Sequence, residues 1–208
     1  MKILIVDDHA VLREGLLQII ATLPCAAETG EAESGQEALA QLRAQEWNLV
    51  VLDISLPDRN GLDLLKQIKV LYPRLPVLIL SMHGEAEYAV RAFRSGAAGY
   101  LTKRTARTEL VEAIQKISAG KRYITPEVAE QLFVDQGGGA ADRPLSVLTD
   151  REFQVMTMIT SGLRIKDVAE RLGLSAKTVS THRTNILEKL GLQGTADLIR
   201  YAIARGLP

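Results

Sequence analysis

Short apolar runs alternate with helix-period segments along roughly the first 120 residues of the chain. The predicted strands are 3–6, 26–32, 49–52, 77–80 and 100–101. The predicted helices between and after them are 11–23, 36–45, 62–72, 85–95 and 108–119. Parallel strands need crossover connections, which place helices on both faces of a sheet. The alternation therefore predicts an α/β domain with a doubly wound, five-stranded parallel sheet.

The last third of the chain shows helical periodicity alone. The predicted helices there are 150–160, 165–172, 176–190 and 195–204. Thr149 and Glu152 have the spacing of a capping box, and Ser175 precedes the third helix as a natural cap. The second and third helices, joined by a tight turn, match a helix-turn-helix. The sequence thus predicts an all-α domain of four helices.

A glycine-rich segment lies between the two regions. Gly137, Gly138 and Gly139 carry maximal backbone freedom, which favours a linker. Thr125 and Pro126 favour a short helix at 125–133 before it. We therefore expect a first domain at 1–120, a linker with a short helix at 121–143, and a second domain at 144–208.

The charge balance supports two domains of opposite character. The whole chain holds 25 basic and 25 acidic residues and is formally neutral. Before Arg143 there are 15 basic and 19 acidic residues, a net charge of −4, and from Arg143 onward there are 10 and 6, a net charge of +4. A positive C-terminal domain favours nucleic acid as a partner.

The composition also bears on the compartment. Cys25 is the single cysteine, so the chain has no internal disulfide. We find no signal-peptide pattern and no apolar run near the roughly 18 residues of a transmembrane helix. We expect a cytoplasmic protein without a membrane partner.

Several polar residues fall at the carboxyl ends of predicted strands. Asp7 and Asp8 follow the first strand, Asp53 the third, Ser81 the fourth, and Lys103 the fifth. Turns favour aspartate and serine anyway, so any single position carries little weight. Together, however, three converging carboxylates repel one another unless a cation compensates, and oxygen ligands favour Mg²⁺.

The same residues resemble the signature of bacterial two-component receiver domains over roughly the first 120 residues. The resemblance rests on Asp7 and Asp8, on Asp53 with Pro57 and Gly61, on Ser81, and on Tyr100 with Lys103. It implies a flavodoxin-like sheet with strand order 2-1-3-4-5. The family often has a cis-proline after the lysine, where this chain has Arg104.

The resemblance also implies roles for individual residues. Asp53 would accept the phosphoryl group, and Asp8, Asp53 and the Ser55 carbonyl would bind Mg²⁺, with Asp7 acting through water. Ser81 and Lys103 would contact the phosphoryl group. Tyr100 would respond to the movement of Ser81, although a half-buried strand aromatic without a switching role remains an open alternative.

The C-terminal region resembles the DNA-binding domains of the NarL, FixJ and LuxR class. The matching segments are 148–152, 165–169, 174–175 with Thr178, Val179 and His182, and 189–191. Helical spacing places Val179, Ile186 and Leu190 on the core side of the third helix, with Lys177, Ser180, Thr181, Arg183 and Thr184 facing outward.

The class implies how this helix would contact DNA. Ser180, Thr181 and Thr184 would lie near base edges, while Lys177, Thr178, His182 and Lys189 would contact phosphates. One such domain makes a small interface, so a homodimer on two half-sites is expected. Leu198, Ile199, Tyr201 and Ala202 on the last helix are the candidate dimer surface, with packing inside their own domain as the alternative.

These features predict a phosphorylation-dependent DNA-binding response regulator of transcription, not an enzyme, with a sensor histidine kinase as its partner. Two alternatives stay open. A regulator that is never phosphorylated would not need Asp7, Asp8, Asp53, Ser81 and Lys103 together. An aspartyl-phosphate hydrolase would leave the second domain unexplained.

Overall fold

The computed structural model describes residues 1–23, 28–82, 86–125, 128–129, 144–205 and 207. The chain divides into two compact units, residues 1–133 and 134–208. The predicted short helix at 125–133 and the glycine segment at 137–139 lie mostly or wholly outside the described residues.

The first unit is a five-stranded parallel sheet with the order β2-β1-β3-β4-β5, as predicted. Its strands are β1 (Lys2–Val6), β2 (Glu28–Ala32), β3 (Leu49–Asp53), β4 (Val77–Ser81) and β5 (Gly99–Thr102). Its helices are α1 (Ala10–Ile20), α2 (Gly35–Ala44), α3 (Gly61–Leu71), α4 (Ala86–Arg94) and α5 (Ala106–Ser118).

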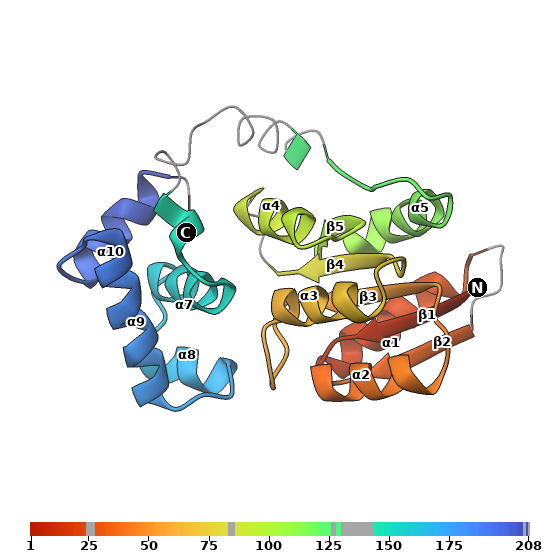
Figure 1. Cartoon of the computed structure of the whole chain (residues 1–208), viewed down its shortest axis with the longest axis horizontal. Coiled ribbons are helices and arrows are strands. Elements are labelled where there is room, and N and C mark those ends of the chain that lie inside the picture. Colours follow the sequence, from red (N-terminus) through yellow and green to blue (C-terminus); the bar gives the residue numbers. More distant parts are fainter. Residues whose placement is uncertain (24–27, 83–85, 126–127, 130–143, 206, 208) are drawn as a thin grey trace. The chain divides into compact units, whose positions relative to one another are not determined.

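Helices cover both faces of this sheet (Figure 1). Ile3 and Ile5 face α1 and α5, and form one core with Leu16 and Leu110. Leu4 and Val6 alternate with them along β1 and are fully buried as well. Because both faces are covered, the central strands read as continuous apolar runs, which is the pattern that made them predictable.

The strand register brings the carboxyl ends of the strands to one edge. Val6 pairs with Leu52, Asp53 with Leu80, and Ser81 with Thr102. The chain does not leave the sheet where α5 ends. The amide of Tyr123 donates to the Ala98 carbonyl at 2.9 Å, and Tyr123 forms a bridge with Gly99 beside β5.

The second unit contains a short 3-10 helix at Pro144–Val147 followed by four α-helices, as predicted. They are α7 (Asp150–Thr160), α8 (Ile165–Arg171), α9 (Ala176–Leu190) and α10 (Thr195–Ile203). The predicted capping box of Thr149 and Glu152 is present at α7. Ser175 caps α9 by accepting the Thr178 amide.

Two details of this unit differ from the sequence analysis. The core side of α9 was predicted to include Leu190, which is only half-buried. Leu187, next to Ile186, is buried instead, where α9 packs on α7. Leu198 and Ala202 on α10 are fully buried where α10 contacts α7. These two residues stabilise their own domain and are not available as a dimer surface, in contrast to Ile203, which is 67% exposed.

None of the described helices combines the length and the apolar character that crossing a membrane requires.

Candidate functional site

The carboxyl edge of the sheet brings the predicted acidic residues and lysine into direct contact. Nζ of Lys103 lies 2.8 Å from Oδ2 of Asp53 and 2.7 Å from Oδ2 of Asp7. Both carboxylates are 1% exposed and the lysine side chain 5%. Residues 50 positions apart in the chain thus form one buried charge cluster, as their place at the strand ends predicted.

The loop after Asp53 depends on Gly61. The Gly61 amide donates to the Ile54 carbonyl at 2.7 Å, which closes the loop. A Cβ added at Gly61 would lie 2.1 Å from the carbonyl oxygen of Asp53. Asn60 caps α3 by accepting the Leu62 amide. The backbone of the candidate acceptor is therefore held directly against the start of the next helix.

Burial and neighbouring charges set the protonation of this cluster. Burial raises the pKa of Asp53, Lys103 opposes the rise, and the Asp7 carboxylate adds to it. Burial alone would lower the pKa of Lys103, but Asp53 and Asp7 together raise it above its ordinary value. The lysine therefore stays charged at neutral pH and serves as a fixed positive charge.

The acidic residues also meet the requirements of a divalent cation. Ligand atoms of Asp7, Asp8, His9 and Asp53 lie within 4.8 Å of one another. Oδ1 of Asp53 is buried and has no hydrogen-bond partner among the described residues. A buried carboxylate oxygen without a partner is costly, and a cation bound there would satisfy it. Three of these four residues are carboxylates, so the cluster fits a hard cation such as Mg²⁺.

The remaining predicted residues of this edge lie on β4 and β5. Ser81 is completely buried at the end of β4, and its carbonyl accepts the Lys103 amide at 2.7 Å. Tyr100 on β5 is 6% exposed and is therefore a buried aromatic, not a half-buried one. After Lys103 the chain turns through hydrogen bonds between Thr102 and Thr105, and the described backbone contains no cis peptide bond.

Two neighbours of the acidic pair gain contacts that the sequence analysis did not assign. His9 stands at the N-cap position of α1, yet its side chain caps nothing. Its Nδ1 lies 2.7 Å from Oδ1 of Asp8 and 3.2 Å from Oδ1 of Asp7. Arg13 reaches the backbone carbonyl of Asp7. The sequence feature that could have identified Arg13 is its position on the same buried face of α1 as Leu16 and Ile20.

The outward face of α9 carries the predicted DNA-contact residues. Lys177, Thr178, Thr181 and Thr184 are exposed, and Ser180, His182 and Arg183 are half-buried. Thr181 and Thr184 donate their hydroxyl hydrogens to the carbonyls of Lys177 and Ser180 at 3.1 Å. Burial lowers the pKa of His182, Arg151 adds to this, and Glu152 opposes it. The imidazole is thus neutral at pH 7.

Two cations predicted on this surface already have partners inside the domain. Nζ of Lys189 lies 2.6 Å from Oε2 of Glu152, whose side chain is 5% exposed. Nε of Arg183 donates to Oγ1 of Thr195 at 2.8 Å. The first contact joins α9 to the start of α7 and the second joins it to α10. Lys177, by contrast, has no ion pair within the described part of the chain.

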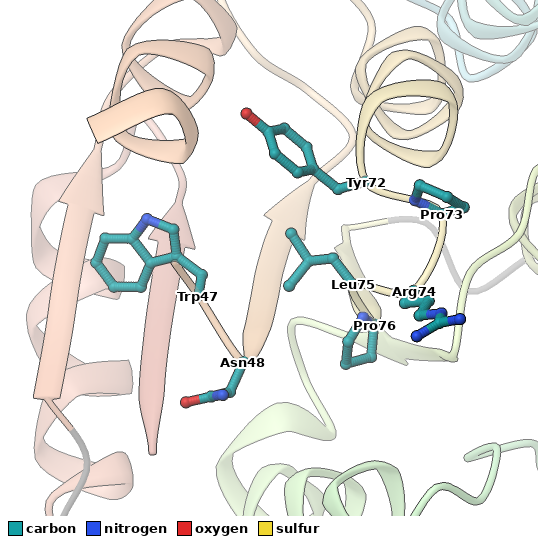
Figure 2. A pocket seen from close by; sticks show the side chains of 7 residues that line it. All are labelled: Trp47, Asn48, Tyr72, Pro73, Arg74, Leu75 and Pro76. Atoms are coloured by element: carbon teal, nitrogen blue, oxygen red, sulfur yellow. The ribbon is translucent and has the colours of Figure 1, made fainter. Parts of the chain in front are cut away.

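Hollows also occur at the opposite edge of the sheet. Figure 2 shows one of about 440 Å³, lined by Trp47, Asn48, Tyr72, Pro73, Arg74, Leu75 and Pro76. Asn48 precedes the first residue of β3, whereas Asp53 ends that strand. This hollow is therefore remote from the acidic cluster and takes no part in the chemistry considered for it.

A buried aspartate cluster on a doubly wound sheet, followed by a helix-turn-helix unit, defines a class of signal-controlled DNA-binding proteins. Comparison with known families agrees. Residues 3–115 match the model of the response regulator receiver domain, and residues 146–202 match that of bacterial regulatory proteins of the luxR family. The chain belongs to the response regulators that join a receiver to a LuxR-type DNA-binding domain, and these act in transcription.

Curated relatives share this organisation over their whole length. The chain is 33% identical to the response regulator GacA of Pseudomonas protegens over 207 residues, which are 100% of this chain and 97% of the relative. It is 34% identical to the response regulator UvrY of Escherichia coli over 208 residues, covering 100% and 95%. These relatives are named as regulators and not as enzymes.

Solved structures show the same fold. RcsB of Salmonella typhimurium matches with a TM-score of 0.68 at 23% identity, covering 97% of this chain and 96% of that one. A structure described as an RcsB–DNA complex matches with a TM-score of 0.60 at 23% identity.

Proposed function

We propose that Asp53 accepts a phosphoryl group from a sensor histidine kinase and that this modification controls binding of the C-terminal domain to promoter DNA. The observation that carries this proposal is the buried contact of Lys103 with both Asp53 and Asp7. It places a nucleophilic carboxylate beside a fixed positive charge, at an edge of the sheet where functional groups gather in this fold.

Phosphoryl transfer needs positioning and charge compensation more than covalent help from the protein. An oxygen of Asp53 attacks phosphorus, the bond from phosphorus to the kinase histidine breaks, and an acyl phosphate forms. Lys103 stays charged throughout and exchanges its contact with Asp53 for one with a phosphoryl oxygen. The Gly61 loop keeps the Asp53 backbone in place during this step.

Asp8, Asp53 and the Ser55 carbonyl would hold Mg²⁺ directly, and Asp7 would hold it through water. The cation supplies positive charge that offsets the negative charge gathering on the transferred oxygens. Asp7 and Asp53 are already paired with Lys103, so the chain itself compensates part of the charge before a cation binds.

The switch would run from Ser81 to Tyr100. The Ser81 hydroxyl donates to the new phosphoryl group, and the space it leaves admits the Tyr100 ring. Ser81 and Tyr100 are both buried on neighbouring strands. A shift of these two side chains would therefore change the surface formed by β5 and its adjoining helices.

DNA would be bound through α9. Ser180, Thr181 and Thr184 face base edges, and Lys177, Thr178 and His182 contact phosphates, with Arg183 and Lys189 holding the helix in place through their bonds to Thr195 and Glu152. A homodimer on two half-sites supplies the interface area that one such domain lacks. Such a regulator works in the cytoplasm, where its promoters are.

The phosphorylation step is tested by incubating the full chain with Mg²⁺ and acetyl phosphate and measuring its intact mass. We expect one added phosphoryl group in the wild type and none in Asp53→Asn. Continuous release of phosphate over many turnovers would instead identify a hydrolase. No adduct under conditions where the protein is folded would identify a regulator that works without phosphorylation.

A further inference from the structure

Arg13 occupies a position where the helix pattern calls for an apolar residue. The buried residues of α1 are Arg13, Leu16 and Ile20, which share the stripe that packs on the sheet. The Arg13 side chain is 8% exposed. Burying a guanidinium costs free energy that an aliphatic residue would not, so its presence on this stripe needs a reason other than packing.

The guanidinium on α1 binds two other chain segments. Its Nη1 donates to the backbone carbonyl of Asp7 at 2.7 Å, in a fully buried hydrogen bond. Its Nε donates to Oε2 of Glu31 at 2.8 Å, and its Nη2 donates to Oε1 of Glu33 at 2.6 Å. Glu31 lies near the end of β2 and Glu33 just after it. Arg13 therefore ties the start of the β1–α1 loop to the neighbouring strand end.

The same loop segment is fixed from other directions. The amide of Asp7 donates to the Ala32 carbonyl at 3.1 Å, and the amide of His9 donates to Oδ1 of Asp7 at 2.8 Å. With the Arg13 bond, both polar backbone groups of Asp7 are held, its Oδ1 accepts the His9 amide, and its Oδ2 contacts Lys103. Asp8 lies between these anchors, and in the described structure its carboxylate Oδ1 lies 2.7 Å from Nδ1 of His9.

The two glutamates that pair with Arg13 fix the orientation of its guanidinium but add little to the stability of the fold. Glu31 is 48% exposed and Glu33 65% exposed, and ion pairs with exposed groups contribute little net stability. What the glutamates do supply is a fixed direction. A planar guanidinium whose Nε and Nη2 are held by carboxylates presents its third nitrogen, Nη1, to one place, which here is the Asp7 carbonyl.

We propose that Arg13 is a positioning residue for the acidic pair: by clamping the Asp7 carbonyl to the end of β2, it sets the directions of Asp7 and Asp8 toward Asp53 and toward a bound divalent cation. This inference rests on the proposed function of the site. Outer residues that orient metal ligands typically affect metal affinity by 10- to 100-fold when they are removed.

The test compares Arg13→Leu, which keeps the apolar stripe, with Arg43→Leu, which removes an exposed arginine of α2. Hydrogen exchange of the full chain without metal is measured first. We expect faster exchange of the His9 amide in Arg13→Leu, while amides in the middle of β3 exchange as slowly as in the wild type. Arg43→Leu should match the wild type at both places.

Mg²⁺ binding to the same proteins is then measured by calorimetry. We expect a Kd about tenfold higher in Arg13→Leu and unchanged in Arg43→Leu. Arg13→Lys should restore only part of the affinity, because one ammonium cannot make the three directed bonds. The double variant Glu31→Gln with Glu33→Gln should also raise the Kd for Mg²⁺.

The outcomes separate this inference from the proposed function. If the wild type gains a phosphoryl group on Asp53 but Arg13→Leu shows wild-type exchange at His9 and wild-type Mg²⁺ affinity, Arg13 has no positioning role. If Arg13→Leu speeds exchange equally throughout the receiver, its role is general stability and the inference is wrong. If the wild type itself gains no phosphoryl group, the proposed function fails, whatever Arg13 does to the loop.

Discussion

Gly61 shows how one missing side chain determines the geometry of the acceptor. A methyl group at this position would meet the backbone of Asp53 and Ile54, neither of which is free to move without shifting the sheet edge. We expect Gly61→Ala to destabilise the receiver by about 2 kcal/mol and to slow phosphorylation. Urea unfolding followed by Trp47 fluorescence measures the first effect, because Trp47 is the single tryptophan and is buried in the receiver.

Gly15 provides the matched control for that change. It lies within α1, and an added Cβ would meet nothing within 4 Å. Gly15→Ala should therefore stabilise the chain by about 0.5–1 kcal/mol through the better helix propensity of alanine. Equal effects of the two substitutions would show that close packing at Gly61 does not matter.

The buried charge of Asp53 should be visible in the pH dependence of stability. Burial raises the pKa of this carboxyl in the folded chain. Its contribution to stability is therefore complete below the unfolded pKa of about 4 and is lost as pH rises through the folded pKa. Without divalent metal, Asp53→Asn should be more stable than the wild type at pH 7, and the difference should vanish on acidification to about pH 4.

The loss of the Asp53 carboxylate in Asp53→Asn does not leave Lys103 without an ion pair, because Lys103 keeps its contact with Asp7. Asp63→Asn on α3 is a suitable control, since the Asp63 side chain is 57% exposed. Metal-free urea unfolding across this pH range is the measurement. A wild type that is more stable than Asp53→Asn at pH 7 would contradict the assigned direction of the pKa.

At the scale of elements, α9 separates residues that face solvent from residues that hold the helix. Lys177→Ala removes an exposed charge, so binding to all DNA should weaken and the slope of log affinity against log salt should flatten by about one for each bound protomer. Lys189→Ala should change that slope less. Its main effect is to leave the buried Glu152 carboxylate without its cationic partner, with the Thr149 amide still bound to it, at a cost of about 1–3 kcal/mol.

Retardation assays at several salt concentrations and thermal unfolding followed by helical circular dichroism distinguish the two lysines. If Lys189→Ala flattened the salt slope as much as Lys177→Ala and left the unfolding temperature unchanged, Lys189 would be a phosphate contact after all, as the sequence alone predicted.

At the scale of the whole molecule, the two units must communicate for the regulator to work. With acetyl phosphate and Mg²⁺, the wild type should bind DNA with two half-sites more tightly, while DNA with one half-site should respond far less, because dimer binding adds the second interface. Asp53→Asn should keep its basal affinity and lose the response. A response retained by Asp53→Asn would show that the signal does not pass through this residue.

Much of this molecule was predictable because its patterns are local. Continuous apolar runs identify strands covered on both faces, and helical spacing with caps such as Thr149 and Ser175 identifies the helices. The acidic residues and Lys103 were predictable as a group because the ends of parallel strands meet at one edge. Leu187 was missed, and for Leu198 and Ala202 the sequence left a dimer surface and packing within the domain both open, because periodicity identifies a buried face but not the element that covers it.

The sequence by itself determined the order of elements, because helix and strand patterns depend on residues a few positions apart. The division of charge between the two regions and the residue types at the candidate site can be read from the sequence directly. Only the tertiary structure decided which charged side chains pair with one another. The pairing of Lys189 with Glu152 and the clamp of Arg13 on Asp7 and the β2 end join distant segments. Such contacts depend on distances between packed elements, which no local pattern encodes.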